Sequence, residues 1–243
     1  MGVVYRGRDV RLARPVAIKL LLAPEAREGD DRRVRRFARE AEILAGLKHP
    51  GLLAVYDFGF LPERRVPYMI TEWLEGETLE DRLRHEGTLS VAESLDLVEA
   101  ISRAVAFAHE RGVLHRDLKP ANIVLAPRGP VVIDFGLAKR QDPEVSRLTQ
   151  TGSMAGTSGF AAPEQLRDAS GVDERADVYG LGATLYALLT GAPPGGGPEG
   201  GSLMQLAAAA TGVFPPPSQL RSEVPSQVDA LVARALALDP DDR

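Results

Sequence analysis

Two short stretches decide the fold of this chain: His115-Arg116-Asp117-Leu118-Lys119-Pro120-Ala121-Asn122 and Val131-Val132-Ile133-Asp134-Phe135-Gly136. They place an Asp, a Lys, an Asn and a second Asp in two loops that follow apolar strands. Phosphoryl transfer requires a carboxylate at the attacking hydroxyl, ligands for Mg²⁺ and positive charge near the phosphates. Each of these roles has a candidate in the two stretches.

The two stretches resemble the motifs H-R-D-x-K-x-x-N and D-F-G of protein kinases, in that family's order. The resemblance spans essentially the whole chain. Three further stretches are typical of bacterial eukaryotic-like (Hanks-type) serine/threonine kinases: Val3-Val4-Tyr5, Thr149-Gln150-Thr151-Gly152 and Ala162-Pro163-Glu164-Gln165. The resemblance implies an α+β, bilobal protein-kinase-like fold, with an N-lobe and hinge at residues 1–74 and a mainly helical C-lobe at residues 75–243. The N-lobe would hold a small antiparallel sheet and one C-helix.

Composition limits the other classes of function. The chain has 243 residues, no Cys and a net charge of −5. Its length allows a large core, and the absence of Cys excludes disulfides and thiolate metal sites. A negative charge argues against nucleic acid as the main partner. No apolar run reaches the roughly 18 residues of a membrane span, and no signal peptide is evident. We therefore expect a cytoplasmic domain without membrane contact, either alone or as part of a longer, membrane-anchored kinase.

Lysine is rare in this chain and stands at informative places. Of 29 basic residues only four are Lys, and Lys19 ends the apolar run Pro15-Val16-Ala17-Ile18, which predicts a buried strand. By the resemblance, Lys19 contacts the α- and β-phosphates of ATP. Apolar residues at helical spacing predict a helix over residues 33–47, with Glu40 on its apolar face. The resemblance makes this segment the C-helix and Glu40 the partner of Lys19, although a Glu bonded to a nearby Arg is the alternative.

Two further strands are expected at Leu52 to Phe60 and Val66 to Glu72, completing the sheet with the Lys19 strand. By resemblance, the gatekeeper of the adenine pocket is Thr71, and the Glu72 carbonyl and Leu74 amide bond the adenine edge. The other residues that the resemblance assigns to the nucleotide are Gly2, Val4, Ala17 and Val124.

The catalytic roles follow from the resemblance. Asp117 orients the substrate hydroxyl and accepts its proton, Asn122 and Asp134 hold Mg²⁺, and Lys119 offsets charge on the transferred group. Lys119 and Thr157, in Gly156-Thr157-Ser158, are typical of kinases that act on Ser and Thr. The implied cofactors are ATP and Mg²⁺, with Mn²⁺ as an alternative metal. The implied partners are proteins with Ser or Thr acceptors, and the chain itself in trans.

Residues 134–164 form the expected activation segment, which is rich in hydroxyls. Arg116 precedes the catalytic Asp, and kinases with that Arg bind a phosphate on the segment. We expect autophosphorylation at Thr149 and Thr151; an ordinary polar loop is the alternative. A long amphipathic helix is expected from Ser90 to Arg111.

A buried helix is expected from Asp173 to Thr190. By resemblance, Asp177 accepts amides of the catalytic loop, although a helix N-cap would also explain an Asp there. Glu164 is expected to pair with Arg243.

Both ends depart from the family pattern. Gly2 and Val4 match only the end of the Gly-rich loop, so the first strand is expected to be missing, and relatives continue past Arg243. An ATP-binding pseudokinase or scaffold module is therefore the alternative function, although Lys19, Asp117 and Asp134 are all present. A small-molecule kinase of related fold is less favoured, because the Ala162-Pro163-Glu164 stretch indicates a platform for protein substrates.

Overall fold

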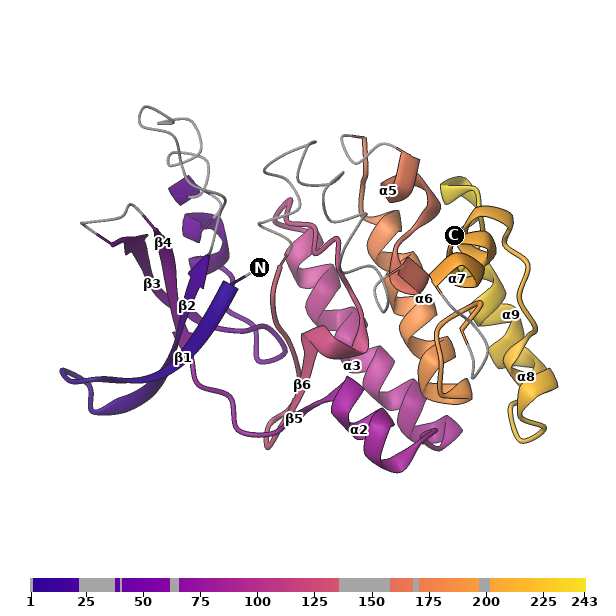
Figure 1. Ribbon diagram of the computed structural model, residues 1–243, viewed down its shortest axis with the longest axis horizontal. Helices are drawn as coiled ribbons and strands as arrows, with labels where there is room; N and C mark the ends of the chain where they lie inside the picture. Colours follow the sequence, from indigo (N-terminus) through magenta and orange to yellow (C-terminus); the bar gives the residue numbers. More distant parts are fainter. Residues whose placement is uncertain are drawn as a thin grey trace.

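The computed structural model describes residues 2–21, 38–39, 41–61, 66–135, 158–167, 171–196 and 202–243. Within these ranges the chain forms two parts, an N-terminal part built on a sheet and a larger C-terminal part built mainly of helices (Figure 1). The segment that follows residue 72 connects them. The expected α+β architecture, an antiparallel sheet followed by a helical part, is confirmed.

The N-terminal sheet has four antiparallel strands in the order β1-β2-β4-β3. The strands are β1 (Gly2–Asp9), β2 (Arg14–Leu21), β3 (Val55–Phe60) and β4 (Pro67–Glu72). The expected strands at 52–60 and 66–72 are thus confirmed with slightly shorter bounds. The β2 strand lies inside the sheet, because Ala17 faces Arg6 of β1 on one side and Thr71 of β4 on the other.

The expected C-helix is described at residues 38–39 and 41–45, all of them helical. Ala41 and Leu44 are buried in the same apolar cluster as Met69 of β4, and Leu47 joins them just after the helix. The apolar stripe therefore faces the sheet, as the helical spacing predicts.

A second, three-stranded sheet lies in the C-terminal part, in the order β5-β6-β7. Its strands are β5 (Glu77–Thr78), β6 (Ile123–Ala126) and β7 (Gly129–Val132). Leu52 forms a parallel bridge with Val132, the last residue of β7. The segment before β3 is therefore hydrogen-bonded to the C-terminal part.

The helical part packs around two long helices. The first, α3 (Val91–His109), begins at Ser90, whose side chain caps it. The second, α6 (Arg175–Thr190), is buried along most of its length and ends at Gly191 in the left-handed conformation. The expected helices at 90–111 and 173–190 are thus confirmed within two residues at each end.

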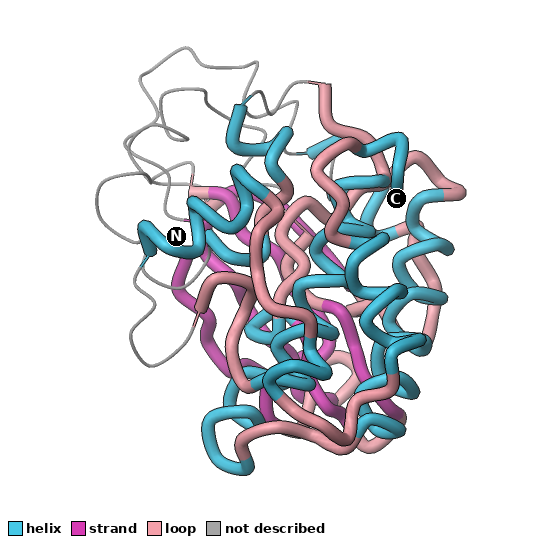
Figure 2. Tube along the Cα trace, turned by 90° about the vertical axis from the view of Figure 1, so that its right-hand side faces the viewer, coloured by secondary structure: helices cyan, strands magenta, loops and turns pink. Residues whose placement is uncertain are grey.

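The other helices are shorter. They are α2 (Leu79–Glu86), η1 (Pro120–Asn122), η2 (Ser158–Phe160), α5 (Pro163–Arg167), α7 (Ser202–Thr211), α8 (Pro217–Leu220), α9 (Ser226–Ala235) and η3 (Pro240–Asp242). Seen from the C-terminal side, helices occupy most of the front of the molecule and strands run behind them (Figure 2).

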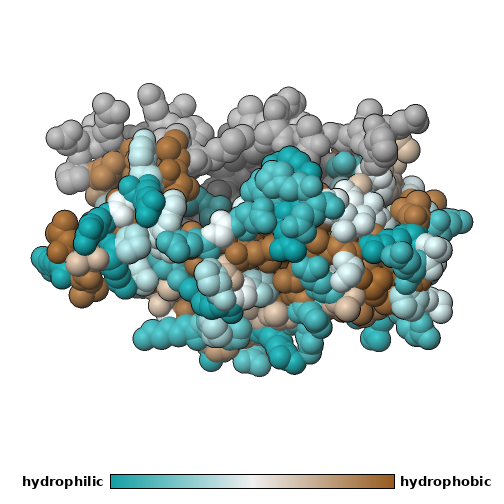
Figure 3. All heavy atoms as spheres, turned by 90° about the horizontal axis from the view of Figure 1, so that it is seen from below, coloured by the Kyte–Doolittle hydropathy of each residue, from teal (hydrophilic) through white to brown (hydrophobic). Residues whose placement is uncertain are grey.

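Two apolar clusters form the core. One joins the sheet and the C-helix to α3 and the β6–β7 hairpin, and the other joins α6 to α9. Val98 of α3 packs against both. The surface seen from below is largely hydrophilic, with apolar patches over the helical part (Figure 3). Among the helices described here, none is long and apolar enough to cross a bilayer.

Candidate active site

The loop between α3 and β6 brings three of the expected catalytic side chains together. The Asp117 carboxylate lies 3.1 Å from Lys119 Nζ through its Oδ2 atom. Asn122 Nδ2 donates to the same oxygen at 3.0 Å and to the Asp117 carbonyl at 2.7 Å. A carboxylate held in this position is a candidate to accept a proton from a bound hydroxyl.

A buried carboxylate fixes this loop. Asp177 of α6 is 1% exposed and accepts the backbone N–H of His115 at 2.8 Å and that of Arg116 at 2.7 Å. His109 Nε2 lies 2.7 Å from the same carboxylate. The N-cap residue of α6 is Glu174, so Asp177 does not occupy the cap. A buried carboxylate needs such partners to offset its desolvation.

Arg116 has a backbone φ of 64°, which is uncommon for a residue other than Gly. Such a conformation costs about 1–2 kcal/mol and persists only where neighbouring contacts hold it. The Arg116 N–H bond to Asp177 is one such contact, and Gln165 Nε2 donates to the Arg116 carbonyl at 2.9 Å as another.

His115 connects the two motif loops. Its side chain is fully buried; Nδ1 accepts the Asp117 N–H at 3.2 Å, and Nε2 donates to the Ile133 carbonyl at 2.8 Å. Its ring lies 4.8 Å from that of Phe135. Burial lowers the pKa of His115, against the smaller opposing effect of the Asp177 charge. The imidazole is therefore neutral, with its proton on Nε2.

Lys19 crosses from the N-terminal sheet to the second motif. Its Nζ lies 2.5 Å from Asp134 Oδ1, and the two side chains are 25% and 41% exposed. Asp134 has a φ of 57°, which turns the chain immediately after Ile133. The sequence did not predict this contact, because Glu40 was the expected partner of Lys19. Glu40 lies outside the described residues.

The residues expected at the adenine lie on neighbouring strands. Ala17 is paired with Thr71, and Val4 with Lys19. Thr71 is buried, and its hydroxyl donates to the Glu72 carbonyl at 3.1 Å. The remaining members of this set are Gly2 at the start of β1, the partly buried Leu74 after β4 and the buried Val124 in β6.

The oxygens near these side chains suit a hard cation. The side-chain nitrogen of Asn122 donates to Asp117. The side-chain oxygen of Asn122 is therefore the atom that can bind a metal. Asp134 adds a carboxylate. Among the described residues no three His, Asp or Glu side chains form a metal cage. This donor set fits Mg²⁺, which takes one or two protein ligands and completes its shell with water and phosphate.

Glu164 and Arg243, expected to pair, are joined by two hydrogen bonds of 2.5 and 2.9 Å. The Arg243 side chain is fully buried and also donates to the carbonyl oxygens of Ala237 and Arg175. This pair connects the start of α5 to the end of the chain.

Besides Glu40, the expected site residues Thr149, Thr151 and Thr157 lie outside the described residues. Three others were missed by sequence reasoning: His109, Gln165 and Arg128. His109 and Gln165 support the catalytic loop, and Arg128 binds Glu72. No spacing rule singles out any of the three, because each acts on a residue that is distant in the sequence.

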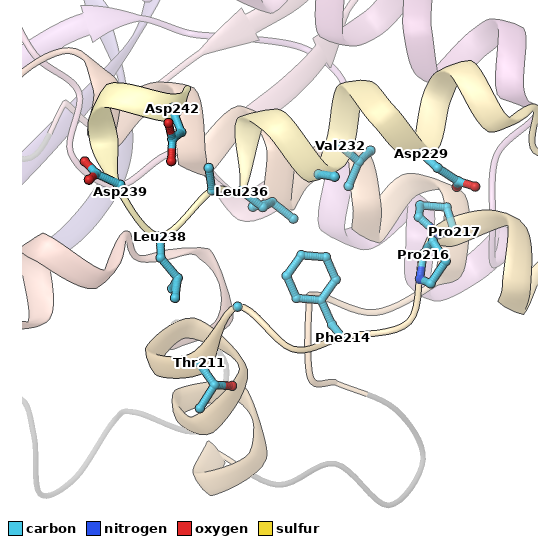
Figure 4. Close-up of a pocket in the computed structure, with 13 residues that line it drawn as sticks. Thr211, Phe214, Pro216, Pro217, Asp229, Val232, Leu236, Leu238, Asp239 and Asp242 are labelled. Atoms are coloured by element: carbon cyan, nitrogen blue, oxygen red, sulfur yellow. The ribbon is translucent and has the colours of Figure 1, made fainter.

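The structure also contains a cavity of about 460 Å³ away from these residues. It lies between the end of α7, the segment before α8, and α9, and its lining includes Phe214, Leu238 and Asp242 (Figure 4). None of the expected catalytic residues lines it. The expected catalytic residues thus lie in the loops after α3 and β7, away from this cavity.

The family described as "Protein kinase domain" matches residues 1–243. The serine/threonine-protein kinases PknB of Mycolicibacterium smegmatis and Mycobacterium leprae are 39% and 40% identical to this chain, over its whole length. The chain spans only 39% of each of those proteins. The crystal structure of the Mycobacterium tuberculosis PknI kinase domain superposes with a TM-score of 0.73 and 32% identity, covering 100% of this chain and 85% of that one.

Proposed function

This chain belongs to the protein kinase domain family, and we propose that it transfers the γ-phosphoryl group of ATP to serine and threonine hydroxyls of proteins. The observation that carries this proposal is the cluster of Asp117, Lys119 and Asn122, held by Asp177, with Lys19 and Asp134 joined beside it. The bacterial serine/threonine kinases that resemble the whole chain support it.

In the proposed reaction the substrate hydroxyl oxygen forms a bond to the γ-phosphorus, and the bond from that phosphorus to the β,γ-bridging oxygen breaks. The hydroxyl proton passes to the Asp117 carboxylate, and ADP leaves with the electron pair of the broken bond. Lys119, within 3.1 Å of Asp117, offsets negative charge on the transferred group. Lys19 holds the phosphates of ATP.

Asn122 and Asp134 would hold Mg²⁺, which supplies charge neutralisation at the phosphates. In this scheme Lys19 exchanges part of its contact with Asp134 for the nucleotide phosphates. Since that contact is partly exposed, the exchange costs little. Mn²⁺ has the same preference for oxygen ligands and is the alternative metal.

The remaining roles belong to the same proposal. Residues 1–74 would form the nucleotide-binding lobe and hinge, with Thr71 as gatekeeper and Glu40 as the partner of Lys19 in the active state. Residues 75–243 would form the substrate lobe. Thr157 would place the acceptor hydroxyl. The chain matches 39% of the length of the PknB proteins, so it would be one domain of a larger protein. That domain would lie on the cytoplasmic side, where ATP is supplied.

Regulation would act through autophosphorylation at Thr149 and Thr151, in cis or between two copies in trans. The Nη2 atom of Arg116 lies 3.5 Å from the Val172 carbonyl, shortly before α6. A phosphothreonine adds about two negative charges and strong acceptors, so it would bind a cation at this place.

The test is to incubate the chain with ATP and Mg²⁺, alongside an Asp117→Asn variant, and to locate phosphate by mass spectrometry. We expect phosphate on Thr149 or Thr151 in the parent only. A second assay with a Ser/Thr peptide library and a Tyr library measures acceptor preference, and we expect transfer to Ser and Thr.

Loss of the proton acceptor should lower the rate by about 10²- to 10⁴-fold while nucleotide binding remains. Transfer that persists in the Asp117→Asn variant would overturn the assignment of Asp117. Nucleotide binding without transfer, in this chain and in one that carries a complete Gly-rich loop, would favour the pseudokinase or scaffold instead.

A further inference from the structure

The side chain of Glu72, the last residue of β4, lies at the centre of a hydrogen-bonded network. Its Oε1 accepts the Ala54 N–H at 2.8 Å. Arg128 donates to both carboxylate oxygens, from Nη1 to Oε2 at 2.6 Å and from Nη2 to Oε1 at 2.6 Å. The Glu72 side chain is 13% exposed. Such two-bond contacts between a guanidinium and a carboxylate are strong and directional.

Arg128 is held at a third point as well. Its Nε donates to the Pro50 carbonyl at 2.9 Å, so all three nitrogens of the guanidinium have hydrogen-bond partners. Lysine could not reproduce this arrangement, because an ammonium is a point donor without a planar fork. The hydrogen bonds to Glu72 raise the pKa of Arg128, which keeps the charge fixed.

The network joins three separate segments. Glu72 ends the N-terminal sheet, Pro50 and Ala54 lie between the C-helix and β3, and Arg128 lies in the turn between β6 and β7. Backbone bonds from Leu53 N–H to the Val132 carbonyl and from Val132 N–H to the Gly51 carbonyl run beside it. Glu72 N–H also donates to the Ala54 carbonyl at 2.9 Å.

This network lies at the start of the segment that connects the two parts of the molecule. Residues 73–76 have no regular helix or strand, and the Glu72 carbonyl and Leu74 amide are the proposed adenine contacts. A segment without secondary structure loses conformational freedom when it binds a ligand, and affinity rises if it is ordered beforehand. The Glu72 side chain is thus anchored at the residue whose backbone is proposed to bind adenine.

We propose that Arg128 is a positioning residue that orders the connecting segment at residues 72–76 before nucleotide binds, and so sets the affinity for ATP. This inference rests on the proposed function for its effect on ATP, but its structural half concerns the free chain. Arg128 does not take part in the transfer step, so its loss raises KM for ATP and leaves kcat nearly unchanged.

The first experiment measures amide hydrogen exchange of the free chain in peptides that cover residues 70–78. The variants are Arg128→Ala and Arg128→Lys. The matched control is Arg103→Ala, which removes an exposed Arg paired with Glu99 on α3. We expect exchange to rise by about tenfold in Arg128→Ala, the factor that loss of one charged hydrogen-bonded contact produces. Arg128→Lys should lie between Arg128→Ala and the parent, and the control should match the parent.

The second experiment uses Trp73, the one Trp of the chain and the neighbour of Glu72, as a fluorescent reporter. Titration with ATP and Mg²⁺ gives Kd for the parent, Arg128→Ala, Glu72→Gln and the double variant. We expect Kd and KM to rise by about three- to tenfold in each single variant and no further in the double one, because both changes break the same contact. The value of kcat in Arg128→Ala should stay within about twofold of the parent.

The outcomes separate this inference from the proposed function. Hydrogen exchange at residues 72–76 that does not change in Arg128→Ala would overturn the inference, whether or not the parent binds ATP. Lower thermal stability with unchanged exchange and Kd would reduce Arg128 to a structural role and would also overturn it. A parent without phosphoryl transfer contradicts the proposed function, while the exchange measurement on the free chain still decides the role of Arg128.

Discussion

The catalytic loop and the Lys19–Asp134 contact would serve neighbouring parts of the proposed phosphoryl transfer, yet they are supported in opposite ways. The loop is fixed by Asp177, which is 1% exposed and accepts two backbone N–H groups. Lys19 and Asp134 meet through a single contact between partly exposed side chains that come from the two parts of the molecule. The C-terminal half of the site is therefore built in advance, and the N-terminal half depends on how the two parts are held together.

This difference separates stability from activity. Exposed ion pairs contribute little to the free energy of unfolding. Removing a buried carboxylate that accepts several hydrogen bonds lowers that free energy strongly, because its donors lose their acceptor. A substitution at Lys19 should accordingly lower activity with little effect on stability, whereas a substitution at Asp177 should lower stability as well as activity.

The largest effect is expected from Lys19→Met. Removing the cation at the proposed phosphate contacts should lower kcat/KM by about a thousandfold, or about 4 kcal/mol. The free energy of unfolding should change by less than about 0.5 kcal/mol, because the lost contact is partly exposed. Steady-state kinetics and urea denaturation measure the two quantities.

Lys48→Met is the control, since Lys48 is exposed and lies outside the site. The control should leave both quantities unchanged. If Lys19→Met lowered the free energy of unfolding by several kcal/mol, the contact with Asp134 would be structural. The Lys19–Asp134 contact would then not differ from the catalytic loop in its contribution to stability.

The next effect is expected from Asp177→Asn. An Asn side chain turns an NH₂ group toward one of the two backbone N–H donors, so one buried donor loses its acceptor and His109 loses a charged partner. The free energy of unfolding should fall by about 3 kcal/mol, and kcat should fall with it because the loop is released.

Urea denaturation of the variant and of Asp96→Asn, an exposed acid on α3, provides the measurement and its control. Normal stability in Asp177→Asn together with lost activity would mean that Asp177, like Lys19, serves activity and contributes little to stability.

Much of the fold was predictable, because periodic apolar residues mark the strands and the two long helices. Lys19 after an apolar run and the motif around Asp117 point to the proposed catalytic side chains. The helices from α7 to α9 were not predicted individually, and the order β1-β2-β4-β3 is a property of pairing between distant segments. Boundaries moved by up to three residues, as at Leu52, which forms a bridge instead of starting a strand.

The parts of the site that the sequence could not predict are contacts between distant residues. Arg128 lies 56 residues from Glu72, and Asp134 lies 115 residues from Lys19. Nothing in a turn such as Pro127-Arg128-Gly129 distinguishes an Arg that binds Glu72 from a solvated Arg. The sequence predicted backbone contacts at Glu72 and gave its side chain no role, and the structure shows that this side chain has a network of its own.

The smallest effect is expected at His115, in the catalytic loop, and it concerns how the free energy of unfolding depends on pH. Burial lowers the pKa of His115 in the folded chain, whereas an unfolded His titrates near about 6.5. Above that pH the imidazole is neutral in both states and adds no pH dependence. Below it the unfolded chain takes up a proton that the folded chain does not, so stability falls with falling pH, by at most about 1.4 kcal/mol per unit.

Urea denaturation between pH 8.0 and 5.5 tests this. Carboxyls with lowered pKa, such as Asp173 beside Arg175, lose their contribution only at lower pH, so they do not mask the slope. His115→Phe should lower stability at pH 8.0, because the bond to the Ile133 carbonyl is lost, and should flatten the slope below about pH 6.5. His85→Gln, whose side chain is 69% exposed in the parent, should keep the parent slope. An unchanged pH dependence of stability in His115→Phe would show that His115 takes up a proton in the folded chain as well as in the unfolded chain. The catalytic loop, which is the more firmly held half of the site, would then be accessible to protons.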